Sequence, residues 1–310
     1  MAIQTHNWSA LDELQRDAIL ERPAVADDVS IRAGTAAIID EVRRNGDAAL
    51  RKLTAEYDRA DVHQLRVSGE ELDRAEKLLT QEQLDAIDLA IDNVGKFHRA
   101  QIQADIRVET MQGVLCERVS HPIDAVGLYV PAGTAPLPSA AIMLAVPAQI
   151  AGCPLRVLTT PPKPDGEADP AVLVAASRAG VREIYKVGGA QAIAAMAYGT
   201  ETVPKVAKIF GPGNAWVTSA KTLVSSDPAG AAIDMPAGPS EVLVIADESA
   251  SAEFVASDLL AQAEHGVDSQ VILVTTSSEM GTQVADQIEK QLEQLSRAGI
   301  ARGALENSRI

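Results

Sequence analysis

The chain has 310 residues, 46% of them hydrophobic, so it is long enough for about two domains, each with its own core. Its formal net charge of -16 argues against a basic face for phosphate backbones, and we expect no nucleic-acid partner. No apolar run reaches the roughly 18 residues of a membrane span and no secretory signal pattern opens the chain, so the sequence favours a cytoplasmic enzyme away from membranes.

The two cysteines, Cys116 and Cys153, stand apart from each other and from any CxxC motif. They therefore indicate neither a disulfide framework nor a thiolate zinc site. Because both occur in apolar surroundings, we expect both side chains to be buried.

The first third of the chain is predicted to be helical. Apolar residues recur at helical spacing, with charged residues between them, over residues 31–60 and 72–101. Ser68 and Glu71 have the spacing of a capping box for the second of these segments.

From about Val108 onward, short β-branched segments alternate with alanine-rich helical ones. Predicted strands cover residues 125–130, 156–160, 183–188, 207–210, 241–247 and 270–276, and helical patterns over 139–152, 171–180 and 216–226 separate several of them. This alternation is typical of a mainly parallel sheet covered by helices. We therefore predict an α/β fold whose ligands bind beyond the carboxyl ends of the strands.

Three glycine-containing turns follow predicted strands. One comes after Tyr129, the second carries Gln191 into the first turn of a helix, and the third places Asn214 at the start of another helix. Helix N-termini of this kind present unpaired backbone N–H groups, which suit a pyrophosphate. None of the turns is a GxGxxG motif, and each alone is more typical of an ordinary connection. Together they leave a nucleotide-type ligand and a structural role equally open.

Gln262 and His265 stand three residues apart at the end of a predicted helix, which Gly266 terminates. Residues at this spacing share a helix face, so the two side chains can converge on one point. Histidine nitrogen is a good zinc donor, whereas glutamine oxygen is an uncommon one. The residues by themselves favour a histidine that interacts with the last helical carbonyl groups over a pair of metal ligands.

Four long segments together resemble the histidinol dehydrogenase family: VGLYVPAGTAPLPS, VGGAQAIAAMAYGTETVPKVAKIFGPGNAWVT, AAIDMPAGPSEVLVIAD and SDLLAQAEHGVDSQVIL. The resemblance implies an α/β fold with two intertwined Rossmann-like parallel-sheet domains, preceded by N-terminal helices, and a homodimer. It assigns residues 1–128 with 239–310 to the first domain and residues 129–238 to a second, inserted domain.

The resemblance also implies an activity and its site. Members oxidise L-histidinol through the aldehyde to L-histidine, the last two steps of histidine biosynthesis, and use NAD and zinc. By motif position, the residues that contact NAD would be Tyr129, Gln191 and Asn214. Those that contact the substrate would be Ser240, Gln262 and His265, the last two also as zinc ligands.

Two departures from the family pattern bear on these expectations. Ala132 stands where the family has the first of two glycines, which tightens the approach of the backbone to a ligand. The chain reaches Ile310 before the region in which the family carries a Glu-His pair and two further zinc ligands, so the C-terminus is interpreted as truncated. No catalytic residue is assigned, and we expect the chain alone to be inactive. The remaining histidines are interpreted as surface or structural residues: His6, His63, His98 and His121.

Two other functions stay open at this stage. A relative in the same superfamily could oxidise another primary alcohol, such as a sulfonated diol, which a substrate assay would distinguish. A non-catalytic binding module could also use the same scaffold, because a fold does not fix a function.

Overall fold

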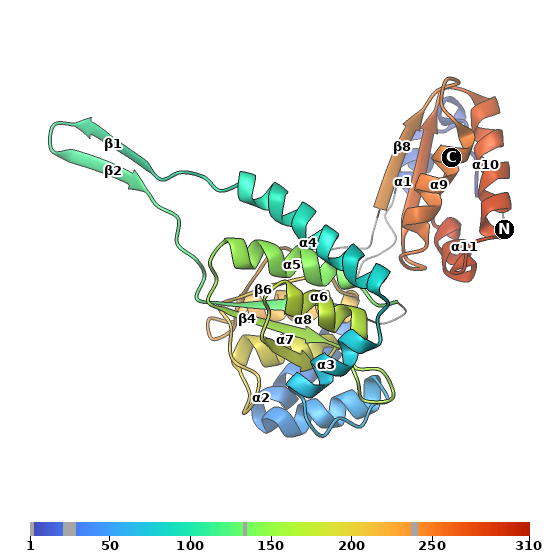
Figure 1. Cartoon of the computed structure of the whole chain (residues 1–310). Helices are drawn as coiled ribbons and strands as arrows, with labels where there is room; N and C mark the ends of the chain where they lie inside the picture. The colour runs from blue at the N-terminus through green and yellow to red at the C-terminus, as the bar shows by residue number, and fades with distance from the viewer. Residues whose placement is uncertain (1–2, 21–28, 133–134, 237–240) are drawn as a thin grey trace. The chain divides into compact units, whose positions relative to one another are not determined.

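The computed structural model describes residues 3–20, 29–132, 135–236 and 241–310. The chain divides into two compact units: unit 1 comprises Met1–Asp27 with Gly238–Ile310, and unit 2 comprises Asp28–Ala237. Unit 2 is therefore an insertion between the two segments of unit 1 (Figure 1).

Unit 2 is built on a five-stranded, all-parallel sheet with strand order β5-β4-β3-β6-β7. Its strands are β3 (Ala125–Tyr129), β4 (Leu155–Thr160), β5 (Glu183–Lys186), β6 (Lys208–Phe210) and β7 (Ala232–Ile233). Its helices are α2 (Val29–Tyr57), α3 (Gly69–Lys77), α4 (Gln81–Ala100), α5 (Pro138–Ile150), α6 (Pro170–Arg178), α7 (Gly189–Tyr198) and α8 (Ala215–Ser226).

Helices cover both faces of this sheet. One core cluster joins α2, α7 and α8 to residues such as Val157 and Ile209 of the sheet. A second cluster joins α3, α4, α5 and α6 to Leu128, Leu158 and Ile184 on the other face. Because side chains alternate along a strand, β3, β4, β5 and β6 each supply residues to both cores, which accounts for their largely apolar sequences.

Helices α2, α3 and α4 belong to unit 2, whereas the predicted division at residue 129 assigned them to the other domain. Helix α2 packs on α7 and α8, and α4 packs on α5. Their apolar faces are therefore buried in the two cores of the five-stranded sheet, and the division falls between residues 27 and 28. The later boundary, between residues 237 and 238, lies next to the predicted one.

The two predicted N-terminal helical segments are present but interrupted. Helix α2 has a break at Gly46, whose φ of 51° is left-handed, and the next backbone N–H, from Asp47, donates to Glu201 Oε2 at 2.7 Å. The second segment forms α3 and α4. Ser68 caps α3 by accepting a hydrogen bond from Glu71 N at 3.1 Å, which is one half of the predicted capping box, whereas the Glu71 side chain pairs with Lys186 Nζ at 3.1 Å.

An antiparallel hairpin, β1 (Ile106–Met111) and β2 (Val114–Arg118), precedes the five-stranded sheet. Its turn contains Gly113 with a φ of 80°. Every residue of both strands is exposed. The prediction that Cys116 is buried is therefore wrong, because an apolar neighbourhood in sequence gives no cover when the whole hairpin faces solvent. Cys153 is buried as predicted.

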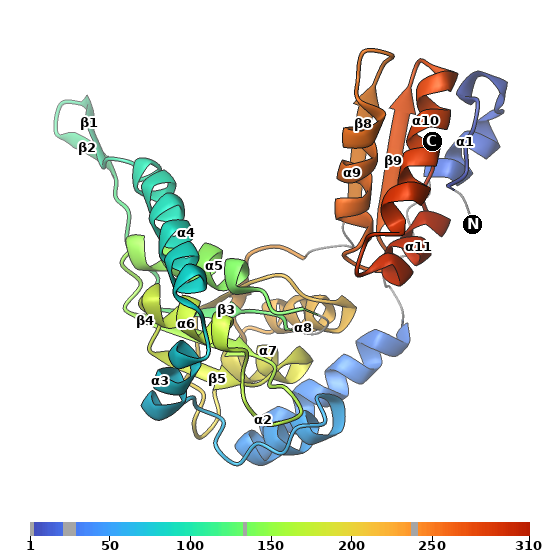
Figure 2. The ribbon, with the colours of Figure 1, turned by 45° about the vertical axis from the view of Figure 1, so that its right-hand side comes forward.

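Unit 1 contains a two-stranded parallel sheet, and its terminal segments meet. Its elements are a short 3-10 helix (Trp8–Ala10), α1 (Glu13–Leu20), β8 (Glu241–Ala246), α9 (Ala252–Ala263), β9 (Gln270–Thr275), α10 (Ser278–Leu292) and α11 (Ala298–Glu306). His6 N donates to Ile310 O at 2.8 Å, and Ile310 N donates to Gln4 O at 2.9 Å. Figure 2 shows α9 and α10 beside this sheet, where they bury its apolar face.

Every strand predicted from residue 125 onward is confirmed, with ends that differ by at most two residues, and so is the parallel α/β class. The pattern missed β7, which is short, and the β1–β2 hairpin. In the ranges that the structure describes, no helix is both long and apolar enough to cross a membrane.

Candidate functional site

The strand order of unit 2 creates a topological switch point between β3 and β6. From β3 the chain proceeds to β4 and β5 on one side, whereas β6 leads to β7 on the other side. The chain segments that follow β3 and β6 therefore start side by side and then run to opposite sides of the sheet. Open parallel sheets bind ligands in the crevice at such a point. Tyr129 ends β3, and Gly211 directly follows β6, so both lie at this edge.

Gly211 brings the two loops into contact. Its φ of 131° is a conformation that favours glycine, and a Cβ atom at this position would lie 2.1 Å from the carbonyl oxygen of Tyr129. Its N–H donates to Asp234 Oδ2 at 2.9 Å, and its carbonyl oxygen accepts from Lys221 Nζ at 2.8 Å. Both polar groups of this peptide segment are thus fixed by side chains.

Lys221 and Asp234 also form an ion pair with each other. Lys221 comes from α8 and is only 3% exposed, and Asp234 directly follows β7. Burial would raise the pKa of Asp234, but hydrogen bonds from Lys221 and from the backbone N–H groups of Gly211 and Met235 outweigh burial and hold it below its usual value. The pair therefore remains charged at neutral pH and anchors the loop after β6.

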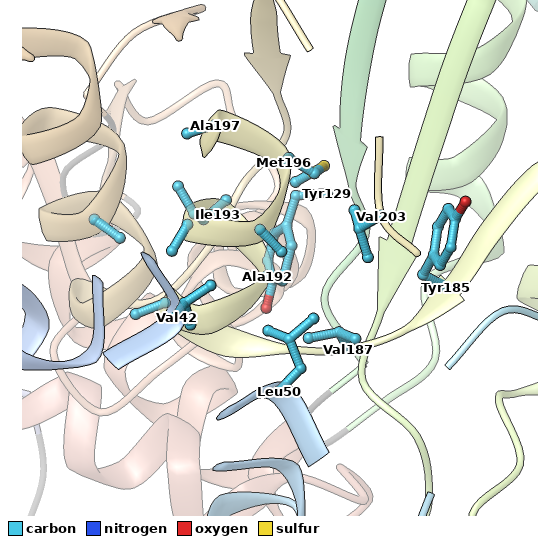
Figure 3. Close-up of a cluster of buried hydrophobic side chains, with 14 of the residues drawn as sticks. Val42, Leu50, Tyr129, Tyr185, Val187, Ala192, Ile193, Met196, Ala197 and Val203 are labelled. Atoms are coloured by element: carbon cyan, nitrogen blue, oxygen red, sulfur yellow. The ribbon is translucent and has the colours of Figure 1, made fainter. Parts of the chain in front are cut away.

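Tyr129 points from the end of β3 into the core beneath α7 (Figure 3). Its hydroxyl oxygen accepts a hydrogen bond from Gly189 N, the first residue of α7, at 3.1 Å. Burial raises the pKa of Tyr129 to about 12. The phenol is therefore neutral at physiological pH and keeps an O–H donor beside the start of α7.

The start of α7 also holds Gln191. Gly189 has a φ of 62°, and a Cβ atom on it would lie 2.7 Å from Gln191 Oε1. The Gln191 side chain is 2% exposed and folds back over the first turn of its own helix. A glycine is required at residue 189 both for the backbone conformation and for the space that Gln191 occupies.

Asn214 is the N-cap of α8. Its Oδ1 atom accepts a hydrogen bond from Val217 N at 3.1 Å, which satisfies one of the free donors at the helix start. The side-chain NH₂ group supplies two further donors. Asn214 thus has a structural role that the sequence pattern did not assign, alongside its position at the switch point.

Gln262 and His265 lie at the C-terminal end of α9 in unit 1. Gln262 is in the last turn, His265 follows the helix and is exposed, and Gln262 Nε2 contacts His265 Nδ1 at 3.0 Å. The side chains meet, as their spacing predicted. The contact is a hydrogen bond that joins the amide nitrogen of Gln262 to the imidazole, and it places the amide group, whose oxygen is the atom able to bind zinc, next to the histidine. Among the described residues, His, Cys, Asp and Glu form no group of three or more that could hold a metal.

An open hollow of about 570 Å³ lies at the opposite, amino-terminal edge of the same sheet. Two arginines line it, and both are paired: Arg51 with Asp47 at 3.6 Å and Arg66 with Glu183 at 2.6 Å. Its charges are therefore neutralised within the chain. Parallel sheets bind ligands at the carboxyl edge, so we take the switch point as the candidate site.

Comparison with known proteins gives the family. The sequence profile of histidinol dehydrogenases matches residues 21–310. The chain belongs to the histidinol dehydrogenase family.

Individual histidinol dehydrogenases agree with this assignment. The chain is 56% identical to that of Vibrio cholerae serotype O1 over 308 residues, which cover 99% of this chain and 70% of the relative. It is 54% identical to that of Xanthomonas oryzae pv. oryzae over 304 residues, 98% of this chain and 70% of the relative. The crystal structure of histidinol dehydrogenase from Elizabethkingia anophelis matches with a TM-score of 0.91 and 45% identity, over 99% of this chain and 70% of that one.

The structure brings some of the site residues expected of a histidinol dehydrogenase together. Tyr129 and Gln191 meet around Gly189, Asn214 caps the next helix of unit 2, and Gln262 contacts His265 in unit 1. The expected substrate contact Ser240 lies outside the described residues. The roles of all these residues stay predictions.

Lys221 and Asp234 were not predicted from the sequence. They stand thirteen residues apart, one in α8 and the other directly after β7, and neither belongs to a recognisable ligand spacing. One signal was present in the sequence: a lysine within the apolar pattern of residues 216–226. A lysine on the buried side of a helix requires an anionic partner, and the structure supplies Asp234.

Proposed function

We propose that this chain carries the cofactor-binding part and one half of the metal site of a histidinol dehydrogenase that oxidises L-histidinol through the aldehyde to L-histidine with NAD and zinc. The observation that carries the proposal is 56% identity to a histidinol dehydrogenase over 99% of the chain. Ser240 as a substrate contact and the homodimer belong to the same proposal.

The geometry of unit 2 supports NAD binding at the switch point. Tyr129 and Asn214 offer an O–H and an NH₂ donor at this edge, and Gln191 adds an amide at the start of α7. The loop after β6 is fixed by Lys221 and Asp234, so its backbone is already in position before a ligand arrives. Hydride transfer itself belongs to the nicotinamide.

The contact at the end of α9 supports zinc binding by unit 1. Zinc takes an imidazole nitrogen and, less often, an amide oxygen, and the hydrogen bond between Gln262 Nε2 and His265 Nδ1 holds one group of each kind side by side. Rotation of the Gln262 amide would turn its oxygen toward the metal. They fit as two zinc ligands and do not by themselves make a four-ligand site. When bound, the metal would orient the alcohol and its amine for oxidation.

The two oxidations require more than these residues supply. Each removes a hydride and a proton, and the second also requires water to add to the aldehyde. A base must accept the proton each time. The family assigns this work to a Glu-His pair, and none of the five histidines of this chain stands in such a motif. We therefore propose that the 310-residue chain binds cofactor but does not turn over L-histidinol.

The test compares this chain with the full-length Vibrio cholerae relative, in the presence of L-histidinol, NAD and zinc. The relative should form two NADH per histidinol, because the reaction removes four electrons. This chain should form none while binding NADH. Turnover by this chain at the rate of the relative would overturn the proposed inactivity, and failure to bind NADH would overturn the assignment of the cofactor site.

A further inference from the structure

Asp58 directly follows α2, and one oxygen of its carboxylate has no hydrogen-bond partner among the described residues. Its backbone N–H continues the helix by donating to Thr54 O at 2.9 Å, and the next residue, Arg59, has a left-handed φ of 56°. Asp58 Oδ2 is buried, and none of the described residues donates a hydrogen bond to it. Left-handed backbone at a residue other than glycine is uncommon, and here it follows directly after the unpaired acceptor.

This acceptor lies at the switch-point edge of unit 2. Helix α2 runs antiparallel to α7: Asp47 accepts from Thr200 Oγ1 at 2.7 Å beyond the end of α7, and Leu50 lies farther along, near Val187 and Ala192 (Figure 3). The end of α2 is therefore directed toward the start of α7. The charge of Asp58 is the smallest of the causes that raise the pKa of Tyr129, which agrees with a position of both residues at this edge of the sheet.

The unpaired carboxylate is costly for the folded chain. Burial alone raises the pKa of Asp58 to about 6. Asp58 is half-buried, and at neutral pH it is still mostly ionised, so the oxygen that is buried without a hydrogen bond lowers stability. Asparagine has nearly the same shape without the charge, so packing gives no reason for an aspartate. An acceptor beside a binding crevice is satisfied when a ligand brings a donor.

We propose that Asp58 accepts a hydrogen bond from a ribose hydroxyl of the bound dinucleotide, in the corner that it forms with Tyr129 and the start of α7, and thereby selects NAD over its 2′-phosphorylated form. The inference rests on the proposed NAD site. A carboxylate suits a vicinal diol, whose O–H groups are donors, and it repels a phosphate dianion at the same position. The residue acts on affinity and selectivity, and takes no part in hydride transfer.

The test measures NADH and NADPH affinity by energy transfer from Trp216 of α8, in a Trp8→Phe background that removes the second tryptophan. We compare the parent protein with Asp58→Asn. Asp61→Asn is the matched control, because it removes the same charge from a side chain that is 88% exposed. The parent should prefer NADH. Loss of one charge-assisted hydrogen bond should weaken NADH by about tenfold in Asp58→Asn, and NADPH should tighten.

The pH dependence gives a second readout. NADH affinity of the parent should fall as the pH is lowered through about 6, where Asp58 becomes protonated, and the fall should be absent in Asp58→Asn. An unchanged NADH to NADPH ratio in Asp58→Asn, with the same pH profile as the parent, would overturn the role of Asp58 while leaving the NAD site intact. A parent protein that binds neither nucleotide overturns the NAD site and this inference together.

Discussion

The two units contain parallel strands of similar sequence in different surroundings. In unit 2, Leu158 of β4 is 0% exposed, because helices cover both faces of the five-stranded sheet. In unit 1, α9 and α10 cover one face of β8 and β9, and the opposite face leaves Leu243 55% and Ile245 78% exposed. A continuous apolar sequence therefore predicts a parallel strand. It does not predict whether another element covers each face of that strand.

Each unit also contains one tryptophan, so its unfolding can be followed separately. Trp8 lies in unit 1 and Trp216 in unit 2. Single-tryptophan versions, made with Trp216→Phe or Trp8→Phe, report the denaturant transition of one unit each. The comparison between the units can therefore be tested by substitutions whose effects should appear in only one of the two transitions.

Breaking the buried ion pair of unit 2 should have the largest effect. Lys221→Met leaves Asp234 charged and without its cation, and we expect the free energy of unfolding of unit 2 to fall by about 3–5 kcal/mol. The double variant Lys221→Met, Asp234→Leu should regain part of this loss. A single variant as stable as the parent would contradict the anchoring of the loop after β6.

Truncation of a leucine should destabilise unit 2 much more than unit 1, because the two leucines differ in burial. Leu128→Ala in β3 removes a side chain that is 1% exposed, and should destabilise unit 2 by about 2–5 kcal/mol. Leu243→Ala in β8 removes one that is 55% exposed, and should change unit 1 by about 1 kcal/mol or less. Equal losses in the two denaturant transitions would mean that the outer face of β8 is covered.

Asp58→Asn should stabilise unit 2 at neutral pH. Because the folded-state pKa is raised from 3.8 to about 6, the contribution of protonated Asp58 is fully present below pH 3.8 and is lost as the pH rises through 6. That difference corresponds to at most about 3 kcal/mol. The stabilities of the variant and the parent should therefore differ least below pH 3.8, separate between pH 3.8 and 6, and keep a constant difference above pH 6, as measured by urea unfolding across this range. A parent that is the more stable protein at pH 7 would contradict the unpaired carboxylate.

Removal of a helix-cap side chain should give the smallest difference in stability loss between the two units. Asn214→Ala removes the side-chain acceptor that caps α8, and should cost unit 2 about 1 kcal/mol. Ser251, at the same position of α9, makes no cap bond with its side chain in the described part of unit 1, so Ser251→Ala should be nearly neutral. Thermal or urea unfolding of the two variants gives the comparison, and a larger loss for Ser251→Ala would reverse it.

The sequence was sufficient to predict the strands and the contacts between residues that lie a few positions apart in the chain. Apolar segments separated by helices gave the parallel α/β class, and a spacing of three residues gave the contact of Gln262 with His265. The family resemblance supplied the roles. It did not reveal that Asn214 caps a helix, which depends on where α8 begins.

The sequence pointed to Tyr129 but missed Asp58, because the two belong to distant parts of the chain. Asp58 follows α2, Tyr129 ends β3 and Gly189 begins α7, and only the antiparallel packing of α2 on α7 brings the first toward the other two. The exposure of the β1–β2 hairpin was likewise not predictable from its residues, because burial depends on the neighbouring elements. A local sequence pattern predicts helices and strands. The assembly of a site and the burial of a surface depend on tertiary structure, which the pattern does not contain.

The measurement that tests the account most directly is NADH titration of four proteins: the Trp8→Phe parent, and Tyr129→Phe, Gln191→Ala and His265→Ala in the same background. The proposed dinucleotide contacts lie in unit 2 and the proposed zinc ligands lie in unit 1. We therefore expect His265→Ala to bind NADH like the parent, whereas Tyr129→Phe and Gln191→Ala should bind it several-fold more weakly, as expected for the loss of about 1 kcal/mol from each hydrogen bond. Unchanged affinity in both unit 2 variants, or an equal loss in folded His265→Ala, would contradict this assignment.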